Sequence, residues 1–185
     1  MIILISGIII FFAVHLIPGF AGIRQALVAR LGDKPYRGLF TLLSFIGLAL
    51  IIWGKASAEA VFVYVTPFWV FKLMPPLMVV AFILMAASGM KSNIKRFTRH
   101  PQLWGVTLWS AGHLAANGDQ ASILLFGSFL LFSLYDMWSA NRRGAQKQVE
   151  KLPVAKDIQV VVAGTVVAVV IAFAHPWLFG VKAIV

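Results

Sequence analysis

The chain has 185 residues, of which 61% are hydrophobic and 12% are charged. Soluble domains carry about 25% charged residues, so this chain lacks the polar side chains needed to cover a water-facing surface. We expect a polytopic membrane protein, with room for about six spans of roughly 20 residues and for no separate soluble domain. The absence of cysteine excludes disulfides, thiolate haem ligation, iron–sulfur clusters and cysteine zinc sites.

Hydropathy predicts an all-α fold class, a bundle of about six transmembrane helices that residues 1–185 form as a single domain. The predicted spans, in chain order, are about 2–23, 38–54, 73–90, 102–117, 121–140 and 158–180. The first is expected to be retained rather than cleaved as a signal peptide, because no Lys or Arg precedes it and no small-x-small cleavage site follows it. The third is expected to begin at Pro75-Pro76, since proline is tolerated in the first helical turn.

Two connecting segments are also distinctive. Residues 56–71 are apolar and aromatic, and Tyr64 and Trp69 suit a segment that lies at the membrane interface. Residues 141–157 are polar and basic, and we expect a flexible loop there with at most a short interfacial helix.

The basic residues predict the orientation of the helices. The loops after the first, third and fifth spans hold four, four and five of the 16 basic residues, which leaves Lys55, Lys72 and Lys182 for the other side. By the positive-inside rule these three loops face the cytoplasm and both termini lie outside. This predicts a multi-pass protein of a bacterial inner membrane. Cations facing anionic lipid headgroups explain the net charge of +10, and no nucleic-acid-binding motif accompanies it.

His15 and His113 lie deep inside predicted spans, where an ionisable side chain is costly and often functional. At a rise of about 1.5 Å per residue, they lie about 12 Å and about 15 Å from the same face of a core about 30 Å thick. At matching depth on different helices, they are candidates to bind a metal, in particular a haem iron, from two sides. The alternative for His15 is a neutral imidazole bonded to a carbonyl, such as that of Val14, which Pro18 would free.

His100 and Asp136 are expected near the cytoplasmic face of the membrane. Asp136 is expected to pair with Arg99 or to form a hydrogen bond with His100, because either partner lowers the cost of its charge. The pair is either an ion pair that locks the loop or a site in which Asp136 orients His100. The fourth histidine, His175, is expected to be an interfacial cap at the outer rim.

Four segments of the sequence together resemble the NnrU family of bacterial integral membrane proteins, and the resemblance spans nearly the whole chain. They are residues 12–24, 32–40, 98–105 and 109–119. The most specific block runs from Arg99-His100-Pro101 to His113-Leu114-x-x-Asn117-Gly118-Asp119. The family takes its name from an association with nitrite and nitric oxide metabolism in denitrification. It is also similar to the zeta-carotene isomerases, membrane enzymes that use haem b.

The resemblance implies haem b as cofactor, with His15 and His113 as iron ligands and His100 as a further functional histidine. One or two arginines of the predicted cytoplasmic mouth would pair with haem propionates, and the candidates are Arg24, Arg37 and Arg99. We therefore expect a membrane protein that binds haem b and acts on a nitrogen-oxide or lipophilic small molecule. The reaction is either part of nitrite and nitric oxide metabolism or isomerase-like.

Two other functions stay open. One is a cofactor-free accessory protein that supports a nitrogen-oxide reductase. The other is an S-adenosylmethionine-dependent membrane methyltransferase, because enzymes of the isoprenylcysteine and phospholipid type also contain Arg-His-Pro with a glycine four residues after the proline, as at Gly105 here. Those enzymes carry a paired Glu-Glu downstream, whereas here only the lone Glu150 follows Arg142 and Arg143.

Overall fold

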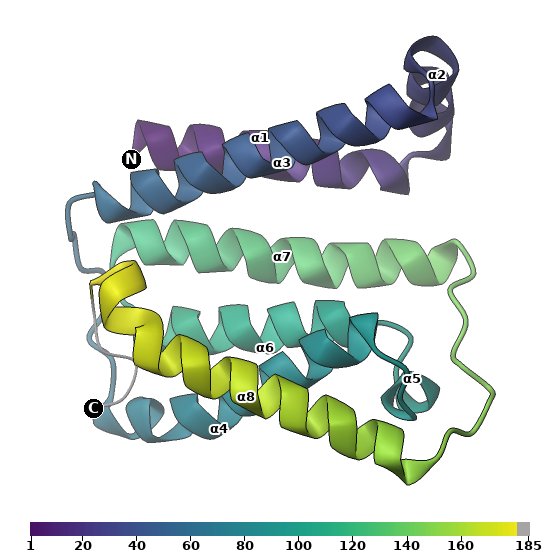
Figure 1. Cartoon of the computed structure of the whole chain (residues 1–185). Coiled ribbons are helices and arrows are strands. Elements are labelled where there is room, and N and C mark those ends of the chain that lie inside the picture. Colours follow the sequence, from purple (N-terminus) through teal and green to yellow (C-terminus); the bar gives the residue numbers. More distant parts are fainter. Residues whose placement is uncertain (181–185) are drawn as a thin grey trace.

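The computed structural model describes residues 1–180, and that part of the chain is almost entirely helical (Figure 1). The all-α class predicted from the sequence is confirmed, and Lys182 lies outside the described residues. The elements, in chain order, are α1 (Ile2–Leu16), the 3-10 turn η1 (Ile17–Gly19), α2 (Ala21–Leu31), α3 (Asp33–Ala56), α4 (Phe68–Gly89), α5 (Ile94–Phe97), α6 (Pro101–Ala116), α7 (Gln120–Arg142) and α8 (Val154–Phe179).

Five of these segments are long and apolar enough to cross a membrane, so the chain is a multi-pass membrane protein. They are α1 with η1, α3, α4, α7 and α8. The fourth predicted span corresponds to α6, which at 16 residues is about 24 Å long. About six spans is therefore roughly what the structure contains.

Two predicted helix boundaries are wrong by seven residues each, and proline is the reason in both cases. The first span was expected to reach residue 23, but α1 ends at Leu16 and Pro18 lies in η1, because proline has no N–H to continue the helix. The third was expected to begin at Pro75-Pro76, but α4 begins at Phe68 and both prolines lie inside it. A membrane helix tolerates internal proline where its neighbours compensate for the lost hydrogen bonds.

The helices form two groups that meet at α7. α1 and α3 form an antiparallel hairpin, while α4 packs against both α6 and α8 (Figure 1). Helix α7 contacts α6 on one side and the hairpin on the other. Glycines bring α1 and α3 close together: a Cβ added at Gly7 would lie 2.6 Å from the backbone nitrogen of Ile51, and one at Gly47 would lie 2.8 Å from that of Phe11. Small residues allow this approach between membrane helices.

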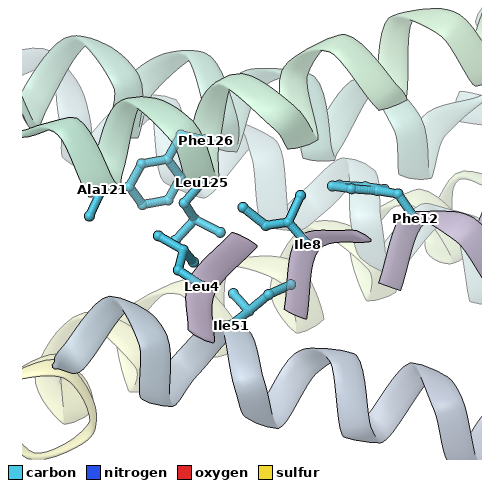
Figure 2. Close-up of a cluster of buried hydrophobic side chains, with 7 residues drawn as sticks. All are labelled: Leu4, Ile8, Phe12, Ile51, Ala121, Leu125 and Phe126. Carbon is cyan, nitrogen blue, oxygen red and sulfur yellow. The ribbon is translucent and has the colours of Figure 1, made fainter. Parts of the chain in front are cut away.

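A buried apolar cluster joins α1, α3 and α7 (Figure 2). It consists of Leu4, Ile8, Phe12, Ile51, Ala121, Leu125 and Phe126. On the other side of α7, the buried hydroxyls of Thr107 and Ser133 form a 2.9 Å hydrogen bond between α6 and α7. Apolar packing therefore joins α7 to the hairpin, and this hydrogen bond adds to the aromatic contacts between α7 and α6.

The loops divide between two ends of the bundle. At one end lie α2, α5 and the loop 143–153, which we call the basic end (Figure 1). At the other end, residues 57–67 form an extended connection that we call the strap, where Phe62 makes a β-bridge with Asp119. The loop 143–153 contains no helix and is held through Asn93, whose side chain bonds to Asp157 and to the backbone of Leu152.

Candidate functional site

His15 lies in the last turn of α1, next to the basic end. Its Nδ1 is 2.6 Å from the carbonyl oxygen of Phe11, and its ring stacks on the Phe11 ring with centroids 4.1 Å apart. The acceptor is therefore the Phe11 carbonyl and not that of Val14, which accepts from the backbone N–H of Ile17. With Nδ1–H donating, Nε2 carries the lone pair, and it makes no hydrogen bond within residues 1–180. The side chain is thus oriented with Nε2 available to a ligand.

A groove between α1 and α3 includes this imidazole, and we call it the His15 groove. It holds about 250 Å³ and is lined by Phe11, His15, Phe40, Thr41, Ser44, Phe45 and Leu48. Ser44 donates its hydroxyl to the Phe40 carbonyl, while Thr41 and Phe45 are exposed. Because these positions lie within the membrane-spanning length of α3, the groove opens sideways towards lipid.

His113 lies in the last turn of α6, towards the strap end. Its Nδ1 is 2.9 Å from the carbonyl oxygen of Trp109, so Nε2 is again the ring nitrogen left for a ligand. The ring contacts Trp109 and Phe126. The His15 groove does not include it.

The structure does not bring His15 and His113 together. His15 contacts Phe132 on α7, whereas His113 contacts Phe126, six residues earlier and therefore about 9 Å away along the helix. Between these levels lies Phe129, which contacts Phe11, Phe12 and Trp109.

We call Phe12, Phe129 and Trp109 the aromatic block. The sequence-based depths matched because the predicted spans began and ended elsewhere. With α1 ending at Leu16 and α6 at Ala116, each histidine lies in the last turn of its own helix, and α1 ends towards the basic end whereas α6 ends towards the strap.

His100 and Asp136 face different partners at the basic end. His100 is the N-cap residue of α6, and its Nε2 lies 3.0 Å from Oδ1 of Asn141. Asp136 forms an ion pair with Arg143, 3.6 Å away. Asp136 and Asn141 are separated by about 140° around α7, which explains why the predicted contact of Asp136 with His100 or Arg99 is not formed. The observed partner, Arg143, is the C-cap residue of the same helix and also donates to Ser139 on α7.

The three arginines predicted to line one mouth are also dispersed. Arg24 is exposed on α2, and Arg99 donates to Asn141 on the α6 side of α7. Arg37 forms an exposed ion pair with Asp33 and lies one helical turn before Thr41. Of the three, Arg37 is the one beside the His15 groove.

Sequence reasoning assigned no role to Lys55 and Asp119, which form a polar cluster at the strap end. Asp119 is 8% exposed, caps α7 by accepting from the backbone N–H of Ser122 at 3.0 Å, and pairs with Lys55 at 2.9 Å. Burial alone would raise the pKa of Asp119, but the hydrogen bonds from Ser122 and Lys55 and the Lys55 charge outweigh it and hold the pKa below its ordinary value. The signal for this cluster was an Asp at an N-cap position, just before an apolar run.

Gly118 explains part of the Asn117-Gly118-Asp119 block. Its carbonyl accepts from the backbone N–H of Val63 at 2.7 Å, and a Cβ at this position would collide with the Tyr64 carbonyl. Tyr64 in turn donates its hydroxyl to the Leu114 carbonyl. This block therefore holds the strap against the end of α6.

Within residues 1–180, no group of three or more His, Asp or Glu side chains is placed to hold a metal ion. Comparison with known families gives a match to the family described as NnrU protein over residues 3–183, nearly the whole chain. Searches of curated proteins and of solved structures found no match.

Proposed function

Because the chain belongs to the NnrU family, we propose that it binds haem b inside the membrane, with His15 as an iron ligand, and acts in nitrite or nitric oxide metabolism. The orientation of His15 carries the proposal. Its Nδ1 is held by the Phe11 carbonyl, and its ring lines a groove that opens towards lipid. Metal-binding histidines are usually held in this way, by a hydrogen bond from the nitrogen that does not bind the metal.

The residues of the His15 groove suit a haem that is bound along one edge. Ligand pockets start at roughly 300 Å³, and the groove holds about 250 Å³, so its residues would cover only part of a porphyrin. Phe40, Phe45 and Leu48 are the apolar surface for the macrocycle. Arg37 is the cation placed to pair with a propionate, a geometry that guanidinium groups favour.

When bound, haem b supplies an iron centre that takes a small ligand or exchanges an electron. The chain contributes His15 to hold the iron, apolar walls that exclude water, and a sideways opening for uncharged molecules dissolved in the bilayer. Nitric oxide is such a molecule. The excess of basic residues at α2, α5 and the loop 143–153 supports an inner-membrane orientation with this end in the cytoplasm.

His113 is the second candidate ligand, and the aromatic block lies between it and the groove. We therefore propose that His15 would hold the iron without His113, so that the iron would remain accessible to a small molecule. A bis-histidine site would require Phe129 and its neighbours to move out of the space they fill between α1, α6 and α7.

Visible absorption of the purified protein, oxidised and dithionite-reduced, tests the proposal. We expect a Soret band in the wild type, its loss in His15→Gly, and its recovery when free imidazole is added to that variant. His113→Ala and the control His175→Ala should keep the pigment. Loss in His113→Ala as well would show a bis-histidine site.

A colourless wild type, after expression with excess haem, would overturn the proposal. It would favour a cofactor-free accessory protein, and S-adenosylmethionine binding that depends on Arg99 and His100 would then be the next measurement.

The sideways opening of the groove also favours a second candidate function, a haem-dependent isomerase-like reaction on a lipophilic substrate. A spectral shift of the reduced protein on addition of nitric oxide supports the first function. A comparable shift that only a long-chain polyene produces supports the second.

A further inference from the structure

Helix α2 has eleven residues, and none of them is buried. It begins at Ala21, immediately after the first membrane span, which ends at Gly19. Figure 1 shows α2 beyond the ends of α1 and α3 and turned across their direction. Because α1 and α3 cross the membrane, a helix at their end that runs across them lies along the membrane surface.

The side chains of α2 suit that position. Ile23, Leu27 and Leu31 recur every four residues and form one stripe, and at 100° per residue Arg24 and Arg30 lie on either side of it. Ile23 and Leu31 are 53% and 43% exposed, so the fold leaves much of this stripe uncovered. Arg24 and Arg30 are exposed, and neither forms an ion pair within residues 1–180.

We propose that α2 binds the anionic phospholipids of the leaflet at the basic end. Ile23 and Leu31 enter the boundary between headgroups and acyl chains, while Arg24 and Arg30 bind lipid phosphates. Charge complementarity selects this partner: guanidinium groups bind phosphate oxygens through paired hydrogen bonds, and arginine keeps its charged head among the headgroups while its stem lies on apolar surface. The inference stands on α2 alone and does not depend on haem binding.

The absence of cysteine from the chain allows a clean probe experiment. Ile23→Cys places a label on the exposed stripe, and Gln25→Cys places a control label about 160° away around α2. Each full-length variant carries an environment-sensitive fluorophore in nanodiscs of phosphatidylcholine, with or without phosphatidylglycerol.

With phosphatidylglycerol present, we expect the label at position 23 to shift to the blue and to resist quenching by acrylamide. The label at position 25 should stay accessible. Equal quenching of both labels in the anionic nanodiscs would overturn the proposal. So would protection of position 23 that appears only in native membranes, because the occupant would then be a protein.

A second arm separates a specific surface from overall charge. Arg24→Gln combined with Arg30→Gln removes two charges from α2, and Lys147→Gln combined with Lys151→Gln removes two from the exposed loop 143–153. A cation near an anionic surface contributes about 1 kcal/mol, or about fivefold, so the arginine variant should weaken the docking equilibrium of α2 about 25-fold. The lysine variant should change it less than twofold. An equal effect of both variants would assign the attraction to net charge and refute the site.

Discussion

Replacement of Asp119 tests whether the strap-end cluster stabilises the bundle. Asp119→Ala removes the N-cap of α7, a change that costs about 1 kcal/mol, and leaves the Lys55 ammonium without its partner at 2.9 Å. Breaking a fully buried ion pair costs 3–5 kcal/mol, but 35% of the Lys55 side chain is exposed, so we expect about 1–2 kcal/mol from this contact. The free energy of unfolding should fall by about 2–3 kcal/mol in total.

Two further variants divide this magnitude into its parts. Asp119→Asn removes the charge but keeps a side chain that caps helices well. Its loss in free energy of unfolding should therefore be smaller than that of Asp119→Ala by about the capping energy, roughly 1 kcal/mol. Asp33→Asn breaks the exposed pair with Arg37 and should cost no more than about 1 kcal/mol.

The assay is the free energy of unfolding in mixed micelles titrated with dodecyl sulfate. Equal losses for Asp119→Asn and Asp119→Ala would show that the carboxylate does not act as a cap. A loss for Asp33→Asn as large as that for Asp119→Ala would refute the argument from burial.

Three other predictions follow from the same contacts. Because the pKa of Asp119 is lowered in the folded protein, its carboxylate contributes fully to the free energy of unfolding above its unfolded pKa, about 3.9. This contribution should disappear as the pH falls through the lower pKa of the folded state. Unfolding of the wild type and of Asp119→Asn below about pH 4 measures the loss. Thr107→Val removes the hydrogen bond between α6 and α7 and should cost about 0.6 kcal/mol in the micelle assay. Gly118→Ala should loosen the strap and make Tyr64 more accessible to a quencher, whereas Gly127→Ala, which meets no neighbour within 4 Å, should not.

The proline boundaries show what a local pattern can predict in this chain. Pro18 and the pair Pro75-Pro76 are equally visible in the sequence, yet α1 stops before the first and α4 continues through the second. Proline removes a hydrogen-bond donor in both cases. Whether the helix continues depends on the neighbours that compensate for the loss, and at α4 these are α6 and α8, which pack along it. That information is not local.

The sequence by itself determined the class of the molecule: the shortage of charged residues requires a membrane environment, the apolar segments set about six helices, and the basic loops share one end. These properties depend on composition and short-range periodicity, which each segment carries alone. Only the tertiary structure decided which side chains meet. It separated His15 from His113, directed Asp136 to Arg143 and joined Lys55 to Asp119. The end points of a helix set the depth of each residue, and the rotation of the helix and its neighbours set which side chain that residue meets.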